Sequence, residues 1–280
     1  MNLDVNTNED LARSGTGIVI SKIPYQEADA IITMICSTGE KSSFYVYKGF
    51  SGSKKKQSSI WELGHVISFS TTLNKFGQST NDSSALHSIK EAKLKWQHFH
   101  IRHSHLAFFT LQFMSEVIKN VSLTAKAYEE MNLYHLMTNA IYFLDQNVAP
   151  EKEINIHTHL NIFLGKLIYI LGIFPIVNSC LFCHQAFVQN QPSIFIKEQG
   201  GFSCLNCSSH VDLHKMHAQG GTRKSTAILN LLLSTHASQY RQIDFQNGSS
   251  NQDLWRELFD YLCIQVQLNP NLFKSLRFLR

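Results

Sequence analysis

The sequence predicts an α+β protein, in which a small N-terminal β barrel precedes a helical domain that a cysteine-rich module interrupts. Three observations support this class. Short segments rich in β-branched and aromatic residues occupy the first part of the chain, apolar residues then recur every three or four positions, and four cysteines stand in two close pairs. The length of 280 residues corresponds to about two domains.

The barrel is predicted from four short segments that are rich in Ile, Val, Phe and Tyr. These expected strands are 17–23, 30–36, 42–47 and 65–70. Thr38, Gly39 and Glu40 have the composition of a hairpin turn between the second and third strands. Several short strands within about 85 residues are typical of a closed or partly open barrel. We place this domain at residues 1–84, of which the polar stretch 74–84 is read as strand end and linker.

Helical periodicity follows the barrel. The expected helices are 89–119, 130–145, 154–171, 223–239 and 251–267. Gly172 and Pro175 have the residue types that end a helix. The helical domain is therefore expected at 85–176 and 222–280, with a separate module at 177–221 inserted between its two parts.

Composition and charge exclude some classes and leave others open. With 44% hydrophobic and 16% charged residues, the chain is not broadly disordered. A formal net charge of +4 permits a nucleic-acid partner without requiring one. The most apolar stretch, 160–174, contains Lys166 and is shorter than the roughly 18 residues of a membrane span. Residues 1–10 have no apolar run that would suit a signal peptide. We expect a soluble, cytoplasmic protein with reduced thiols and no membrane partner.

The four paired cysteines predict a metal site. Cys180 and Cys183 are separated by two residues, as are Cys204 and Cys207, and twenty residues lie between the pairs. Two residues between thiolates allow one turn to aim both sulfurs at one ion, and two such turns complete a tetrahedral set of four sulfurs that suits Zn²⁺. We predict a zinc-ribbon-like four-cysteine module with one structural zinc per chain, because no ligand position is left for water.

Other interpretations of the module are open. The cysteines are alternatively reduced and packed, or one pair is a redox pair. Four nearby histidines compete as ligands: His184, His210, His214 and His217. The last three share one helical face, for which an exposed polar surface is the favoured interpretation.

A basic run marks the barrel domain. Five lysines and no acidic residue occur from Lys41 to Lys56, namely Lys41, Lys48, Lys54, Lys55 and Lys56. Such a loop attracts phosphates without reading sequence, although a solvated lysine loop has the same composition. Tyr45, Tyr47 and Phe50 lie among the lysines, where rings stack on the bases of single strands. For these rings, packing in the core is the favoured interpretation. Lys90, Lys93, Lys95 and Arg102 are assigned to the start of the helical part.

No enzyme motif accompanies these features. The sequence contains no GxGxxG, HExxH or Walker-type pattern, and SGSK at 51–54 matches SxxK without the motifs that accompany it in hydrolases. The sequence therefore predicts a protein without catalytic residues.

The order of several short motifs resembles one family, the bacterial recombination mediator RecO. These motifs are GIVISK at 17–22, PYQEAD at 24–29, TGEK at 38–41, KG at 48–49 with KKK at 54–56, LGIFP at 171–175 and KSLRFL at 274–279. The resemblance implies an N-terminal OB-fold, a helical domain and a zinc module. It adds Lys22 to the lysines of the basic run as a DNA-binding residue.

The resemblance also implies a role in DNA repair and homologous recombination. Proteins of this kind bind single- and double-stranded DNA, anneal complementary strands and associate with the nucleoid. They act in the RecF pathway with RecR, RecF and single-strand-binding protein, and help to load the recombinase RecA. The basic run is consistent with this role, because annealing requires that the phosphate charge of two strands be neutralised and requires no covalent chemistry.

Two other functions are open. A zinc-stabilised protein–protein adaptor without DNA binding would use the lysine loop only for solubility. A metal-dependent hydrolase is opposed by the filled set of four sulfurs.

Overall fold

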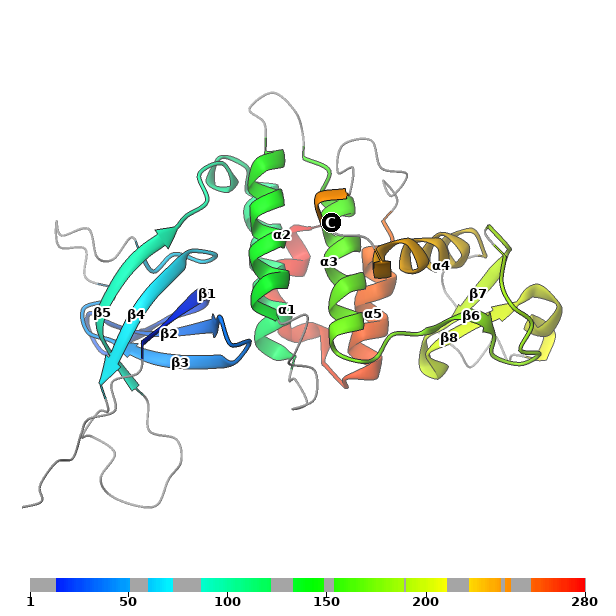
Figure 1. Cartoon of the computed structure of the whole chain (residues 1–280), viewed down its shortest axis with the longest axis horizontal. Helices are drawn as coiled ribbons and strands as arrows, with labels where there is room; N and C mark the ends of the chain where they lie inside the picture. Colours follow the sequence, from blue (N-terminus) through cyan, green and yellow to red (C-terminus); the bar gives the residue numbers. More distant parts are fainter. Residues whose placement is uncertain are drawn as a thin grey trace, which may run out of the picture. The chain divides into compact units, whose positions relative to one another are not determined.

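The computed structural model describes residues 14–50, 60–72, 87–121, 133–148, 154–188, 190–210, 222–237, 240–242 and 253–279. The chain divides into two compact units, Met1–His98 and Phe99–Arg280. Figure 1 shows strands β1–β5 in the first unit, and the helices with strands β6–β8 in the second. The two units are described in turn.

The first unit is a closed barrel of five strands. The strands are β1 (Ser14–Tyr25), β2 (Asp29–Cys36), β3 (Lys41–Val46), β4 (Val66–Thr72) and β5 (His87–Trp96). They pair in the order β1-β2-β3-β5-β4, with β4 closing on β1. β3 and β5 are parallel, and the other neighbours are antiparallel. The four predicted strands are confirmed, and the architecture is that of an OB-fold.

The barrel core follows from alternation along the strands. Side chains that point inward are apolar, and the Phe44 and Phe69 rings meet with centroids 4.8 Å apart. Gly49 shows how closely the chain approaches β2, since a Cβ atom there would lie 2.7 Å from Ala30 Cβ. A larger residue at 49 would push the end of β3 away from the core.

The prediction of a helix from residue 89 is wrong. Residues His87–Trp96 are strand β5, and helix α1 starts only at His105. β5 pairs with β4 along most of its length, from Val66↔Trp96 to Thr72↔Ser88, with irregularities between Val66 and Ile67 and between Ser70 and Thr71. These pairings outweigh the helical preference of its lysines, glutamate, alanine and leucine. The first unit consequently extends to His98 rather than ending at residue 84.

The second unit contains five α-helices among the residues described. They are α1 (His105–Asn120), α2 (Leu133–Asn147), α3 (Ile156–Ile170), α4 (Thr222–Ala237) and α5 (Trp255–Gln265). Side chains cap the N-termini of α1 and α3. Ser104 Oγ accepts a hydrogen bond from the Ala107 amide, and Asn155 Oδ1 accepts one from the Thr158 amide. α3 is buried on nearly every side and contacts α1, α2, α4 and α5. The predicted helices 130–145, 154–171, 223–239 and 251–267 are confirmed within a few residues.

A small three-stranded sheet lies between α3 and α4 in the sequence. Its strands are β6 (Ile176–Cys180), β7 (Ser193–Ile196) and β8 (Gly201–Cys204), in the order β6-β8-β7. Lys197 follows β7 and connects this sheet to α5, because its buried ammonium lies 2.5 Å from Glu257 Oε2 and 3.3 Å from Asp260 Oδ2. None of the helices described has the length and apolar character needed to cross a membrane.

Asp145 is a buried carboxylate that organises the start of the second unit. It accepts hydrogen bonds from the amides of Phe99 (3.2 Å), His100 (2.7 Å) and Ile101 (3.0 Å). Burial raises the pKa of Asp145, but these amide bonds outweigh it and lower the pKa below its ordinary value. The carboxylate thus holds the turn that precedes α1 in its ionised form.

An Asp145→Asn variant is expected to lose about 1–3 kcal/mol of stability at neutral pH, because the charged acceptor of three amides is removed. The pKa of Asp145 is lower in the folded chain than in the unfolded chain, where it is about 3.9. Asp145 therefore contributes its full stabilisation above the unfolded pKa, and this stabilisation disappears as the pH falls through the folded pKa. Urea unfolding at neutral and acidic pH should show the difference between the two proteins shrinking in acid. An equal difference at both values would contradict this account.

Candidate metal centre and nucleic-acid interface

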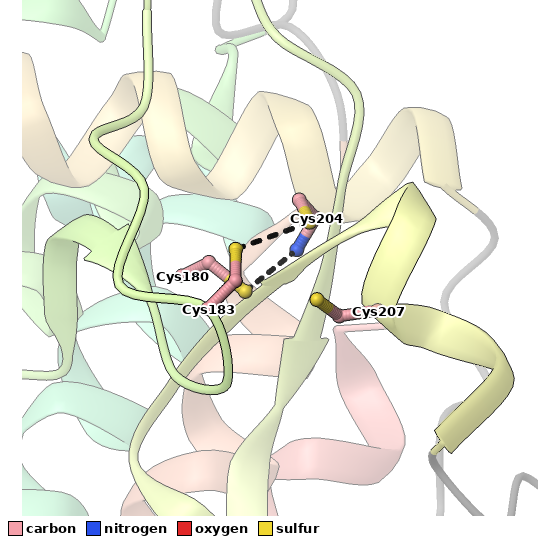
Figure 2. A group of neighbouring side chains, drawn as sticks. All are labelled: Cys180, Cys183, Cys204 and Cys207. Carbon is pink, nitrogen blue, oxygen red and sulfur yellow. Dashed lines mark hydrogen bonds between the residues drawn. The ribbon is translucent and has the colours of Figure 1, made fainter.

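The structure brings the four predicted cysteines together. Cys180 ends β6, Cys183 lies in the turn that follows, Cys204 ends β8 and Cys207 lies in the short helix η4 (Leu205–His210). β6 and β8 pair in parallel, so their C-terminal ends and the following turns meet at one end of the sheet. Figure 2 shows the four side chains converging from these two turns.

The spacing of the sulfurs fits a tetrahedral ion. All four Sγ atoms lie within 4.8 Å of one another, and Cys183 Sγ is 3.8 Å from Cys204 Sγ. Four sulfurs at about 2.3 Å from a central Zn²⁺ would be about 3.8 Å apart. The Cys204 and Phe182 amides point at Cys180 Sγ, at 3.3 and 3.5 Å. Such amides stabilise a thiolate ligand and fix its direction.

Electrostatics in the cluster favour a cation. Burial raises the pKa of the Cys180 thiol, but amide hydrogen bonds outweigh it and lower the pKa to about 6. The hydrogen bond to Cys204, with burial, raises the pKa of Cys207 to about 12. Four thiolates this close together would repel one another, so the whole set can ionise only if a cation shares the centre. The donor set is therefore suited to a soft divalent ion.

The competing histidines do not join this group among the residues described. His184 is exposed and lies outside the four-sulfur group. His214 and His217 lie outside the described residues, as does the side chain of His210.

Three of the predicted DNA-binding lysines, Lys22, Lys41 and Lys48, lie among the described residues of the barrel, in β1, in β3 and just after β3. Lys41 and Lys48 are exposed and Lys22 is half-buried. Lys54, Lys55 and Lys56 lie outside the described residues. Burial lowers the pKa of Lys22, and Glu62 opposes this effect.

Two lysines of the barrel stand over aromatic rings. Lys22 Nζ lies 4.4 Å from the centre of the Phe50 ring, and Lys48 Nζ lies 4.9 Å from that of Tyr47. Tyr47 is 65% exposed and Phe50 is 41% exposed. The preference for placing these two rings in the core is wrong, because both follow the end of β3 at Val46, where strand alternation ceases. The barrel thus presents cations and flat rings side by side.

Asp29 fixes the conformation next to these rings. It accepts hydrogen bonds from the Tyr45 hydroxyl and, at 2.8 Å, from the Lys48 amide. The Tyr45 bond and then the Lys48 amide lower the pKa of Asp29, and the Asp29 bond raises the pKa of Tyr45 to about 12. Lys48 has a positive φ of 52°, which this carboxylate holds in place.

Further basic residues of the barrel were not assigned to it from the sequence. Lys90, Lys93 and Lys95 are exposed side chains of β5, not the start of a helix. An alternating segment between two turn-rich stretches would have been the signal, but charged residues at both faces of β5 obscure it.

Comparison with known proteins agrees with this architecture. Residues 102–276 match the model of the family described as "Recombination protein O C terminal". The chain is also similar to two curated proteins named "DNA repair protein RecO", from Bacillus cereus strains B4264 and ATCC 14579. Each is 22% identical over 248 residues, which cover 80% of this chain and 90% of the relative. Since the family model matches most of the 280 residues, the chain belongs to the recombination protein O (RecO) family.

Proposed function

We propose that this protein acts in DNA repair and homologous recombination by binding DNA through its N-terminal barrel. Family membership supports the repair role. The observation that carries DNA contact is the pairing of Lys22 with Phe50 and of Lys48 with Tyr47 at the exposed end of β1 and β3. Ammonium groups attract the phosphates of a strand, and exposed rings stack on its bases whatever their sequence.

The proposed activity is the annealing of complementary single strands, with binding to duplex DNA as well. Neutralising phosphate charge lowers the repulsion between two strands, and base pairing then supplies the free energy. No bond is made or broken, so the proposal is of a mediator rather than an enzyme. In the cytoplasm and at the nucleoid, the protein would act with RecR, RecF and single-strand-binding protein to assist loading of RecA.

We further propose that the four-cysteine group holds one structural Zn²⁺ per chain. Cys180, Cys183, Cys204 and Cys207 would all be thiolate ligands, and the ion would fix two turns of a sheet too small to have much core of its own. In this proposal residues 177–221 form the module, between the helical segments 99–176 and 222–280.

The DNA-binding proposal predicts a specific change in salt dependence. In a Lys22→Ala/Lys48→Ala variant, the negative slope of log affinity against log salt for a labelled single strand should become shallower by about 1.4, because each lost phosphate contact contributes about 0.7. Adding Lys54→Ala/Lys55→Ala/Lys56→Ala should make this slope shallower still. Fluorescence anisotropy across a salt series measures both.

Arg223→Ala/Lys224→Ala is the matched control, since it removes two exposed charges from α4 in the other unit. Equal losses in the barrel and control variants, or a wild-type affinity that does not depend on salt, would refute binding through the barrel. A strand-annealing assay with and without single-strand-binding protein then tests the activity itself.

A protein–protein adaptor is the second candidate. Phe182 and Leu205, which lie between the two cysteines of their respective pairs, are 38% and 46% exposed. Exposed apolar side chains on a rigid turn suit a protein partner. This function predicts partner binding that Phe182→Ser abolishes, together with no measurable DNA affinity in the assay above.

A further inference from the structure

A polar groove crosses the barrel over strands β1, β4 and β5. Its volume is about 470 Å³, and hydroxyl groups and two lysines, Lys93 and Lys95, dominate its lining. OB-folds that bind nucleic acids usually do so over strands 2 and 3 and the adjoining loops. The groove lies over other strands, and neither Lys22 nor Lys48 lines it.

Strand register builds this groove. Thr16 pairs with Ser68, which pairs with Lys93, so these three side chains form one row across the barrel. Ser14, Ser70 and Glu91 form the next outward row. Phe69 lies between the two rows and points into the core against Phe44, which places its neighbours Ser68 and Ser70 on the outer face.

The chemistry of the lining selects the class of ligand. Small hydroxyl side chains keep the floor low and donate hydrogen bonds, while Lys93 and Lys95 provide positive charge at β5. Glu91 is the one carboxylate among the lining residues, which is too few for a cation site. Apart from Phe69 and Ala92 the lining offers no apolar side chain, so an apolar ligand would gain little. Hydroxyl and ammonium donors together match phosphate oxygens.

We propose that this groove binds the sugar–phosphate backbone of a nucleic-acid strand, as a path separate from the Lys22–Lys48 surface. The inference rests on the proposed function, because it assumes that the barrel binds nucleic acid. A second path gives the barrel positions for two backbones, which annealing of two strands requires. Contacts to backbone and not to bases make the groove indifferent to sequence.

The test compares single substitutions of residues in strand β5. Lys93→Ala should make the negative slope of log affinity against log salt for a labelled oligothymidine shallower by about 0.7, the value of one phosphate contact on a single strand. Lys90→Ala is the matched control, because Lys90 is an exposed lysine of β5 that does not line the groove. Its slope should stay at the wild-type value. Glu91→Gln should tighten binding, because it removes the carboxylate that faces the phosphates.

The outcomes separate this inference from the proposed function. If the wild-type chain binds oligothymidine but Lys93→Ala and Lys90→Ala weaken it equally, the groove is not a binding path and only this inference is wrong. Unchanged or weaker binding by Glu91→Gln would also overturn it. If the wild-type chain binds no strand, the proposed function itself fails. Circular dichroism of each variant confirms that the barrel is intact, as expected for substitutions of exposed side chains.

Discussion

A Cys204→Ser variant is expected to lose the metal and the local structure of the four-cysteine module. Cys204 is buried at the end of β8, and its sulfur is 3.8 Å from that of Cys183. Structural Zn²⁺ contributes about 10–16 kcal/mol in small zinc domains, which exceeds what a three-stranded sheet can supply from its own packing. Zinc released on denaturation should fall from one equivalent per chain to none, and amides of β6–β8 should lose protection from hydrogen exchange.

Cys36→Ser is the matched control for this prediction. Cys36 lies at the end of β2 in the barrel, far from the cluster in sequence and outside the four-sulfur group. It should keep the metal and the protection of β6–β8. Treating the wild-type chain with a chelator should reproduce the Cys204→Ser result. A Cys204→Ser protein with full metal content, or a chelated wild-type chain with unchanged exchange, would refute a structural metal.

A Lys197→Met variant should destabilise the second unit by about 3–5 kcal/mol, the typical effect of removing one partner of a buried ion pair. Lys197 is 5% exposed, and the Glu257 side chain beside it is 13% exposed. Methionine keeps the apolar stem of the side chain but leaves the Glu257 carboxylate buried without its partner. Urea unfolding followed by circular dichroism measures the change in the free energy of unfolding.

Two further variants separate the lost pair from lost packing. Lys197→Met/Glu257→Gln should recover much of the stability, since no uncompensated charge is left. Asp260→Asn should cost at most about 1 kcal/mol, because the Asp260 side chain is 54% exposed and its pairing with Lys197 is screened by water. A double variant as unstable as Lys197→Met would show that packing, and not charge, is the cause.

Local patterns predicted most of the fold, and tertiary pairing decided the rest. β1 to β4 are short apolar segments between turns, so their sequences alone specify strands. The helical interpretation of β5 is wrong because Leu94 stands seven residues before Ile101, which fits a helical period that continues into α1, and because the lysines of β5 favour helices. Pairing with β3 and β4 decides its conformation, and these partners are distant in sequence.

The same distinction applies to the sites. The four cysteines were predictable because each pair closes a local turn, and the spacing itself encodes the geometry. The pairing of Lys197 with Glu257 could not be predicted, because the two residues are 60 positions apart in the sequence and neither belongs to a motif. The exposure of Tyr47 and Phe50 depends on where β3 ends, and alternation cannot locate a strand end to within one residue.

The central position of α3 constrains when the helical unit folds during synthesis on the ribosome. Helix α3 needs α4 and α5 to cover its apolar surface, yet both are translated after the four-cysteine module. A nascent chain that has emerged only as far as β8 exposes α3 to solvent and to chaperones. All four cysteines are therefore synthesised before the helices that close this core, so they can meet in their two turns while α4 and α5 are still being made.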